Sequence, residues 1–147
     1  MPHLIVEYSS NLEERINLDG LMAKLRDRAV ASGVFPLGGI RVRGERRDRY
    51  LVADGAPDNG FVHLTARIGH GRDEETRREA AQALFDVLTR HMQTIFEERG
   101  LGLSFEMVEV DPVTSLKKNN LHERLGGVGS GAAAKNTRSA TSRAPAG

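Results

Sequence analysis

Hydrophobic and polar positions recur in two similar blocks along most of this chain. In each block an apolar strand is followed by a helix with one apolar stripe and then by a second strand. The first block predicts a strand at His3–Ser9, a helix that ends near Gly33, and a strand at residues 39–44. The stripe of this helix falls at i, i+3, i+4, i+7 and i+11. It consists of Leu18, Leu21, Met22, Leu25 and Ala29.

The second block repeats this order with a longer helix. It predicts strands at residues 61–68 and 103–110, with one helix over residues 74–98 between them. Asp73 is a suitable N-cap for this helix, because its carboxylate can accept from a free backbone N–H of the first turn. The expected buried stripe consists of Ala81, Leu84, Leu88, His91, Met92 and Ile95.

The segment between the blocks, residues 49–55, reads as a short strand with a turn that pairs back onto residues 40–46. Two βαβ units in tandem predict a two-layer α+β fold, in which two helices cover one face of a four-stranded sheet. We expect the other face to be apolar as well and to be covered by another copy of the chain, which predicts a homo-oligomer. Its expected apolar residues are Ile5, Leu64 and Phe105 or their neighbours.

Composition divides the chain into one folded domain, residues 1–125, and a tail, residues 126–147. The tail consists mainly of Gly, Ala, Ser and Thr, with Lys135, Arg138 and Arg143 as its cations and no acidic residue. Such a segment buries too little apolar surface to offset the entropy of ordering it. We therefore predict that the tail is disordered.

The charge and residue usage exclude several classes of protein. The 147 residues carry a net charge of +1 and contain few aromatic side chains, so nothing indicates nucleic-acid binding. The absence of cysteine excludes disulfides and thiolate metal sites. No apolar run approaches the ~20 residues that span a bilayer, and no secretory signal is recognisable. These features predict a soluble cytoplasmic protein.

Pro2 is the first candidate for chemistry. If Met1 is removed, the ring nitrogen of Pro2 becomes a free secondary amine at the head of an apolar strand. Amino termini titrate at ~7.7–8.0, and burial or a nearby cation lowers that pKa further, which suits a general base at neutral pH. The structural alternative is that Pro2 only begins an edge strand, where its missing N–H costs nothing.

Several segments, in order and with compatible spacing, resemble the 5-carboxymethyl-2-hydroxymuconate isomerases of the tautomerase superfamily. The resemblance covers residues 2–124. It implies subunits of two βαβ units that assemble as trimers, with an N-terminal proline as base and arginines that bind an anionic substrate. The segments that carry it are Pro2-His3-Leu4-Ile5-Val6-Glu7, Phe35-Pro36-Leu37-Gly38-Gly39-Ile40-Arg41-Val42-Arg43, Ala53-Asp54-Gly55, Phe61-Val62-His63-Leu64, Ile68-Gly69-His70-Gly71-Arg72, Leu103-Ser104-Phe105-Glu106 and Lys118-Asn119-Asn120-Leu121-His122.

Matched motif by motif, the resemblance assigns the base to Pro2 and the catalytic arginines to Arg41 and Arg72. Arg43 matches a further arginine and is a candidate for substrate binding. His70, two residues before Arg72 in a glycine loop, is a second candidate contact. The structural alternative for Arg41 and Arg43 is a solvated strand face, since side chains two apart point the same way. For His3 and His63 we expect structural hydrogen bonds.

The resemblance, together with these residues, implies a cofactor-independent isomerase that needs neither a metal nor an organic cofactor. It would move a proton in a carboxylated dienol, 5-carboxymethyl-2-hydroxymuconate or a close relative, during aromatic-compound catabolism, specifically homoprotocatechuate degradation. Arg suits such a substrate because its planar fork engages both carboxylate oxygens. Two alternatives remain open: a non-enzymatic oligomeric protein of the same fold that binds small acids, and a different activity of the same superfamily.

Overall fold

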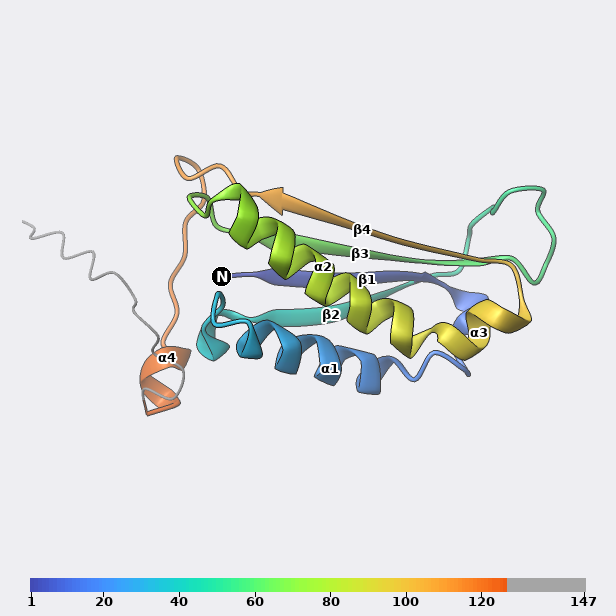
Figure 1. Ribbon diagram of the computed structural model, residues 1–147, viewed down its shortest axis with the longest axis horizontal. Coiled ribbons are helices and arrows are strands. Elements are labelled where there is room, and N and C mark those ends of the chain that lie inside the picture. The colour runs from blue at the N-terminus through green and yellow to red at the C-terminus, as the bar shows by residue number, and fades with distance from the viewer. Residues whose placement is uncertain (127–147) are drawn as a thin grey trace, which may run out of the picture.

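The computed structural model describes residues 1–126, which form one four-stranded sheet and its helices (Figure 1). The strands are β1 (His3–Ser9), β2 (Arg41–Arg47), β3 (Gly60–Ile68) and β4 (Leu101–Glu109). The helices are α1 (Leu18–Ala31), α2 (Glu74–His91), α3 (Gln93–Glu98) and α4 (Leu121–Arg124). Two 3-10 turns precede α1 and β2, namely η1 (Ser10–Leu12) and η2 (Leu37–Gly39).

The sheet order is β2-β1-β3-β4. β1 and β2 are parallel, as are β3 and β4, whereas the central pair β1 and β3 is antiparallel. The chain therefore contains two βαβ units, and α1 and α2 lie over the same face of the sheet (Figure 1). This confirms the predicted α+β fold. The starts of β1 and β2 meet the ends of β3 and β4 at one end of the sheet.

Both long helices begin with a side-chain cap. The Asn17 side chain accepts a hydrogen bond from the backbone N–H of Gly20 at 3.3 Å, and Asp73 accepts one from Thr76 at 2.8 Å. The hydrogen bond from Thr76 holds the pKa of the Asp73 carboxyl below its usual range. The predicted N-cap at Asp73 is therefore confirmed.

The single helix predicted over residues 74–98 is wrong, because the structure divides it at Met92 into α2 and α3. Met92 has φ −93° and ψ 1°, outside the α-helical region, while its side chain is fully buried. Leu88, Met92 and Ile95 are all buried, so the apolar stripe continues across the break. The stripe alone does not reveal where the backbone turns.

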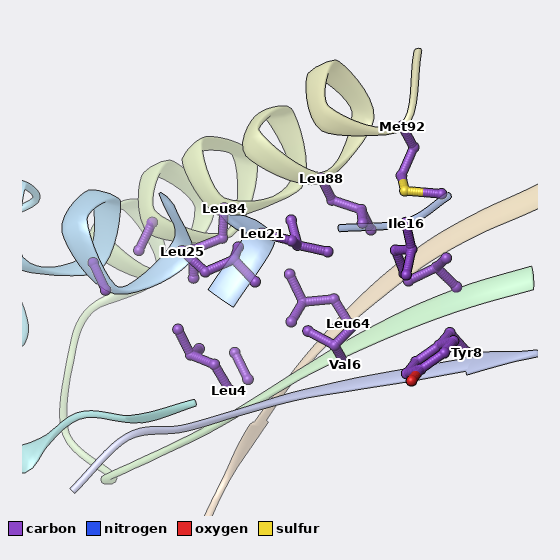
Figure 2. Packing of buried hydrophobic residues seen from close by; sticks show 14 of the residues in the cluster. Leu4, Val6, Tyr8, Ile16, Leu21, Leu25, Leu64, Leu84, Leu88 and Met92 are labelled. Carbon is purple, nitrogen blue, oxygen red and sulfur yellow. The ribbon is translucent and has the colours of Figure 1, made fainter. Parts of the chain in front are cut away.

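The core lies between the sheet and the helices (Figure 2). Alternate residues of the central strands point into it, because successive strand side chains face opposite sides. From the sheet it receives Leu4, Val6, Tyr8, Val62 and Leu64, and from the helices Leu21, Leu25, Leu84 and Leu88, all at most 2% exposed. Fully burying such a side chain stabilises the fold by roughly 1.5–3 kcal/mol.

The prediction that the open sheet face is apolar is wrong. Leu64 pairs with Val6 and Phe105, so all three face the helices, and only Ile5 of the expected set lies on the open face. The neighbours of Leu64 and Phe105 on the open face are polar. That face carries His3, Glu7, Arg41, Arg43, Glu45, Arg47, His63, Thr65, Arg67, Ser104 and Glu106. A shift of one residue in an alternating strand exchanges the two faces.

The short strand predicted at residues 49–55 is also absent. β2 ends at Arg47, and a loop of irregular structure continues to β3. Ala53 and Gly55 have positive φ angles of 53° and 82°, which breaks any extended run. The Asn59 side chain closes the loop by donating to Asp54 Oδ1 at 2.8 Å and to the Val52 carbonyl at 3.2 Å.

After β4 the chain forms an arm, defined here as residues 110–126, that passes the end of the sheet where the chain begins and finishes in α4 (Figure 1). α4 packs against η2. Apart from Gly126, the predicted tail of residues 126–147 lies outside the described residues. In the part that is described, no helix is long and apolar enough to cross a membrane.

Candidate active site

Pro2 lies at the end of the sheet where β1 and β2 begin, and it is buried. Its carbonyl accepts a hydrogen bond from the backbone N–H of Arg41 at 3.0 Å, which ties the start of β1 to that of β2. A Cβ built on Gly39 would lie 3.5 Å from Pro2 Cδ, so η2 packs directly against the ring. With Met1 attached, the Pro2 nitrogen is a tertiary amide and not a base.

Arg41 and Arg72 are held by backbone carbonyls. Arg41 Nη1 donates to the Gly38 carbonyl at 2.9 Å. Arg72 donates to the Gly69 and Val34 carbonyls at 3.2 and 3.1 Å, and its guanidinium carbon lies 4.9 Å from the Phe35 ring centroid. Within residues 1–126 neither arginine forms an ion pair with a carboxylate. Both positive charges are therefore available to an anionic ligand.

These charges act on the N-terminal amine. Burial, followed by the charges of Lys117, Arg72 and Arg41, lowers the pKa of the Met1 amine below its usual value of 8.0. Cations disfavour the protonated form of a nearby amine. Arg41, Arg72 and Lys117 therefore all act electrostatically on the amino terminus.

A cavity of about 330 Å³ opens beside this terminus. Its volume is at the lower end of the range for small-molecule sites. It is lined by Met1, His3, Gly69, His70, Val110, Pro112, Ser115, Leu116 and Lys117. A larger hollow of about 470 Å³ lies on the loop between β2 and β3 and has none of these residues in its wall.

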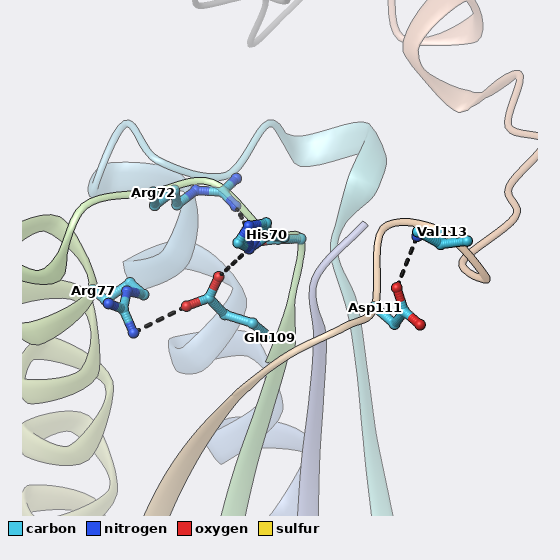
Figure 3. A network of polar contacts seen from close by, with 7 residues as sticks. His70, Arg72, Arg77, Glu109, Asp111 and Val113 are labelled. Carbon is cyan, nitrogen blue, oxygen red and sulfur yellow. Dashed lines mark hydrogen bonds and ion pairs between the residues drawn. The ribbon is translucent and has the colours of Figure 1, made fainter.

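His70 lies in the wall of the cavity and is positioned by an acidic residue (Figure 3). Its Nδ1 lies 3.0 Å from one carboxylate oxygen of Glu109, and Arg77 Nη1 lies 3.0 Å from the other. Glu109 ends β4 and so connects this edge of the sheet to the first turns of α2. With Nδ1 directed at Glu109, the other ring nitrogen of His70 is left for a ligand.

Arg43 lies on the open face of the sheet, as does Arg41, and neither these two arginines nor Arg72 lines the cavity. The Nη1 of Arg43 lies 2.9 Å from His3 Nδ1. Burial first, and then the charges of Arg43 and Arg41, lower the pKa of His3 from its usual value of 6.5, which favours the neutral form of the ring. Among residues 1–126, Arg43 is thereby connected to the cavity wall through His3.

His63, like His3, has the hydrogen bonds expected of a structural histidine. Its Nδ1 lies 2.6 Å from Ser104 Oγ and its Nε2 lies 3.3 Å from Glu106. Over the described part of the chain, no group of three or more His, Cys, Asp or Glu side chains is arranged to hold a metal ion.

The residues that sequence reasoning missed come from the arm. Asn119 donates to the Gly38 carbonyl at 2.8 Å, and the His122 ring packs on Gly38 and Gly39 beside Pro2. Lys117 lines the cavity. The arm has no period in its apolar residues, so the motif at residues 118–122 was the only signal in the sequence.

The chain is similar to known proteins over most of its length. A family model described as 5-carboxymethyl-2-hydroxymuconate isomerase matches residues 2–125. A 5-carboxymethyl-2-hydroxymuconate Delta-isomerase of Escherichia coli is 44% identical over 122 residues, which cover 83% of this chain and 97% of the relative.

Solved structures agree with that similarity. A 5-carboxymethyl-2-hydroxymuconate isomerase from Deinococcus radiodurans R1 superposes with a TM-score of 0.80 at 44% identity, covering 84% of this chain and 93% of the other. A fused 4-OT protein solved as a symmetric trimer has a TM-score of 0.56 at 13% identity, covering 88% of this chain and 99% of the other. At that identity the likeness concerns the fold alone.

Proposed function

The chain belongs to the 5-carboxymethyl-2-hydroxymuconate isomerase family and is an isomerase, and we propose that it acts on 5-carboxymethyl-2-hydroxymuconate with Pro2 as its base. One observation carries this proposal. An N-terminal amine of lowered pKa lies among three cations that have no carboxylate partner within residues 1–126, beside a cavity of about 330 Å³.

Removal of Met1 converts the Pro2 nitrogen from an amide into a secondary amine. It remains next to Gly39 and within the field of Arg41 and Arg72, so the causes that lower the amine pKa of Met1 act on the new terminus as well. Lowering the pKa of an amine raises its unprotonated fraction at neutral pH, and the unprotonated amine can accept a proton.

The proposed reaction breaks one O–H bond and makes one C–H bond. The Pro2 nitrogen takes the proton from the 2-hydroxyl oxygen of the dienol, and the carbon–carbon double bonds shift as the 2-oxo group forms. The protonated nitrogen then returns that proton to a carbon further along the chain. No electrons are gained or lost, so the reaction is an isomerisation.

Arg41 and Arg72 have two roles in this proposal. Their guanidinium groups bind carboxylates in a bidentate manner, which orients the dienol against Pro2. They also stabilise the negative charge that develops on the 2-oxygen when its proton leaves, and such electrostatic stabilisation usually contributes most to the rate. Their own hydrogen bonds to fixed backbone carbonyls hold them in place before the substrate arrives.

His70 is proposed to contact the substrate through the ring nitrogen that does not face Glu109. Arg43 is proposed to act through His3, as a positioning residue. We further propose that the chain assembles as a homotrimer, the arrangement of the fused 4-OT protein of the same fold, and that the reaction belongs to aromatic-compound catabolism.

The test is an ultraviolet assay of untagged protein with 5-carboxymethyl-2-hydroxymuconate, run beside a Pro2→Ala variant. The variant leaves a primary amine in place of the secondary one, and we expect it to lose much of the rate while retaining the fold by circular dichroism. Wild-type protein that does not turn over the compound, or a variant with an unchanged rate, contradicts the proposal.

A further inference from the structure

Lys117 lies on the arm and lines the cavity beside the amino terminus. The residues Ser115, Leu116 and Lys117 form one wall, and Met1, His3 and His70 lie in the same lining. The arm reaches this position because Asn119 and His122 attach its end to η2. Its path past the end of the sheet where the chain begins is visible in Figure 1.

The Lys117 ammonium group has no ion-pair partner within residues 1–126. Two of its neighbours in the cavity lining, Leu116 and Pro112, are apolar. The next residue, Lys118, is also exposed and without an ion-pair partner in that range, but it does not line the cavity. The difference between the two lysines is therefore one of position and not of charge.

The charges of the proposed substrate outnumber the arginines near the amino terminus. A 2-hydroxymuconate has a carboxylate at each end, and the 5-carboxymethyl group adds a third on a flexible methylene. In the proposed function Arg41 and Arg72 bind two of these carboxylates, and both guanidinium groups are fixed by backbone carbonyls. A third cation is needed, and a lysine suits a mobile carboxylate because its compact charge is carried on a flexible stem.

We propose that Lys117 binds the carboxymethyl carboxylate and so makes the site prefer a tricarboxylate to the corresponding dicarboxylate. This inference rests on the proposed function. It adds a residue that determines specificity, contributed by a segment outside the two βαβ units.

Lys117 also affects the N-terminal amine, and the experiment must distinguish this effect from binding of the substrate. Among the neighbouring charges, that of Lys117 lowers the pKa of the N-terminal amine most. If Lys117 acted only on the base, its removal would slow the two substrates equally. If it binds the carboxymethyl group, removal slows only the substrate that has this group.

The experiment measures kcat/KM with 5-carboxymethyl-2-hydroxymuconate and with 2-hydroxymuconate for the wild type, Lys117→Met, Lys117→Arg and Lys118→Met. We expect Lys117→Met to lose about tenfold with the tricarboxylate, since a charged hydrogen bond is lost, and no more than about twofold with the dicarboxylate. Lys117→Arg should retain most of the preference, and Lys118→Met should match the wild type.

Four outcomes overturn the inference. An equal loss with both compounds shows that Lys117 acts through the amine. No loss with either compound, or the same loss in Lys118→Met, shows that position 117 has no specific contact. Wild-type protein that turns over neither compound contradicts the proposed function itself, and the role of Lys117 falls with it.

Discussion

Arg41 and Arg72 differ from Arg47 and Arg78 in what their guanidinium groups contact. Arg47 pairs with Glu7 and Glu45, and Arg78 pairs with Glu74 and Glu75, so those charges are locally neutralised. Arg41 and Arg72 contact carbonyl oxygens instead. A carbonyl orients a guanidinium without removing its charge, which is what a site for anionic substrates requires.

Replacing either of these two arginines should reduce catalysis. We expect Arg41→Ala and Arg72→Ala each to lower kcat/KM for 5-carboxymethyl-2-hydroxymuconate by about 10- to 100-fold, because each loses a charged hydrogen bond to the substrate. Arg78→Ala is the matched control, since Arg78 is exposed on α2 and paired with acids. Equal activity of all three variants and the wild type would show that the arginines are structural.

Tyr8 makes the free energy of unfolding depend on pH. Burial and its hydrogen bond to Glu13 raise the pKa of the Tyr8 hydroxyl to about 12 from 10.0. The folded state therefore holds this proton more tightly than the unfolded state. The resulting contribution to the free energy of unfolding is fully present below pH 10 and is lost as the pH rises toward 12.

We expect the stability advantage of the wild type over Tyr8→Phe to shrink as the pH rises from about 9 to about 11. The measurement is the urea midpoint of unfolding of both proteins at each pH. A difference that stays constant over this range would mean that Tyr8 titrates alike in the folded and unfolded states.

At the scale of elements, the contact between η2 and α4 connects the arm to the start of β1. A Cβ at Gly38 would lie 2.7 Å from His122 Nδ1 and 3.0 Å from the backbone nitrogen of His122. Because one of these atoms belongs to the backbone, a side-chain rotation cannot relieve the overlap. Gly38 thus permits the close approach that brings the arm to the cavity.

We expect Gly38→Ala to displace α4, to destabilise the fold by about 1–3 kcal/mol and to lower activity. Gly102→Ala is the control, because no atom lies within 4 Å of a Cβ built there. Urea unfolding and the isomerase assay measure the two effects. A Gly38→Ala protein as stable and as active as Gly102→Ala would contradict the proposed role of this contact.

Comparing the predicted elements with the observed ones shows how much of the fold the spacing of apolar residues can predict. The paired blocks predicted the sheet, both long helices and the Asp73 cap, since each depends on local spacing or a local hydrogen bond. The break at Met92 and the loop at residues 49–55 were missed, because they depend on backbone angles that apolar spacing does not encode. The open face was assigned wrongly because a one-residue difference in alternation exchanges the faces.

The candidate site was only partly predictable, because some of its residues come from a segment without a periodic pattern. Pro2, Arg41 and Arg72 follow from motifs, and the structure brings them to one end of the sheet. Lys117 and His122 reach the same end through an arm without periodicity, so their proximity to Pro2 follows only from the three-dimensional fold.

At the scale of the whole molecule, the described chain leaves one sheet face and several apolar side chains uncovered. Leu51, Val113 and Leu116 are 83%, 83% and 91% exposed, and they lie on the loop between β2 and β3 and on the arm. Large exposed apolar residues at such positions are typical of contacts with another subunit. These side chains are available for subunit contacts in the proposed homotrimer.

Light scattering coupled to size-exclusion chromatography tests the assembly. We expect a mass of three times the 16.1 kDa chain at micromolar concentration. Leu51→Asp combined with Val113→Asp should shift the population toward monomer, because a carboxylate would have to be desolvated in the interface. A wild-type monomer at these concentrations would contradict the proposal.

The central claim is that the base is a free Pro2 nitrogen, and intact-mass spectrometry of active protein tests it most directly. Preparations in which methionine aminopeptidase has removed Met1 to different extents are weighed and assayed with 5-carboxymethyl-2-hydroxymuconate. The account predicts that specific activity rises in proportion to the fraction of chains that begin at Pro2. Full activity in a preparation whose chains all retain Met1 would contradict it.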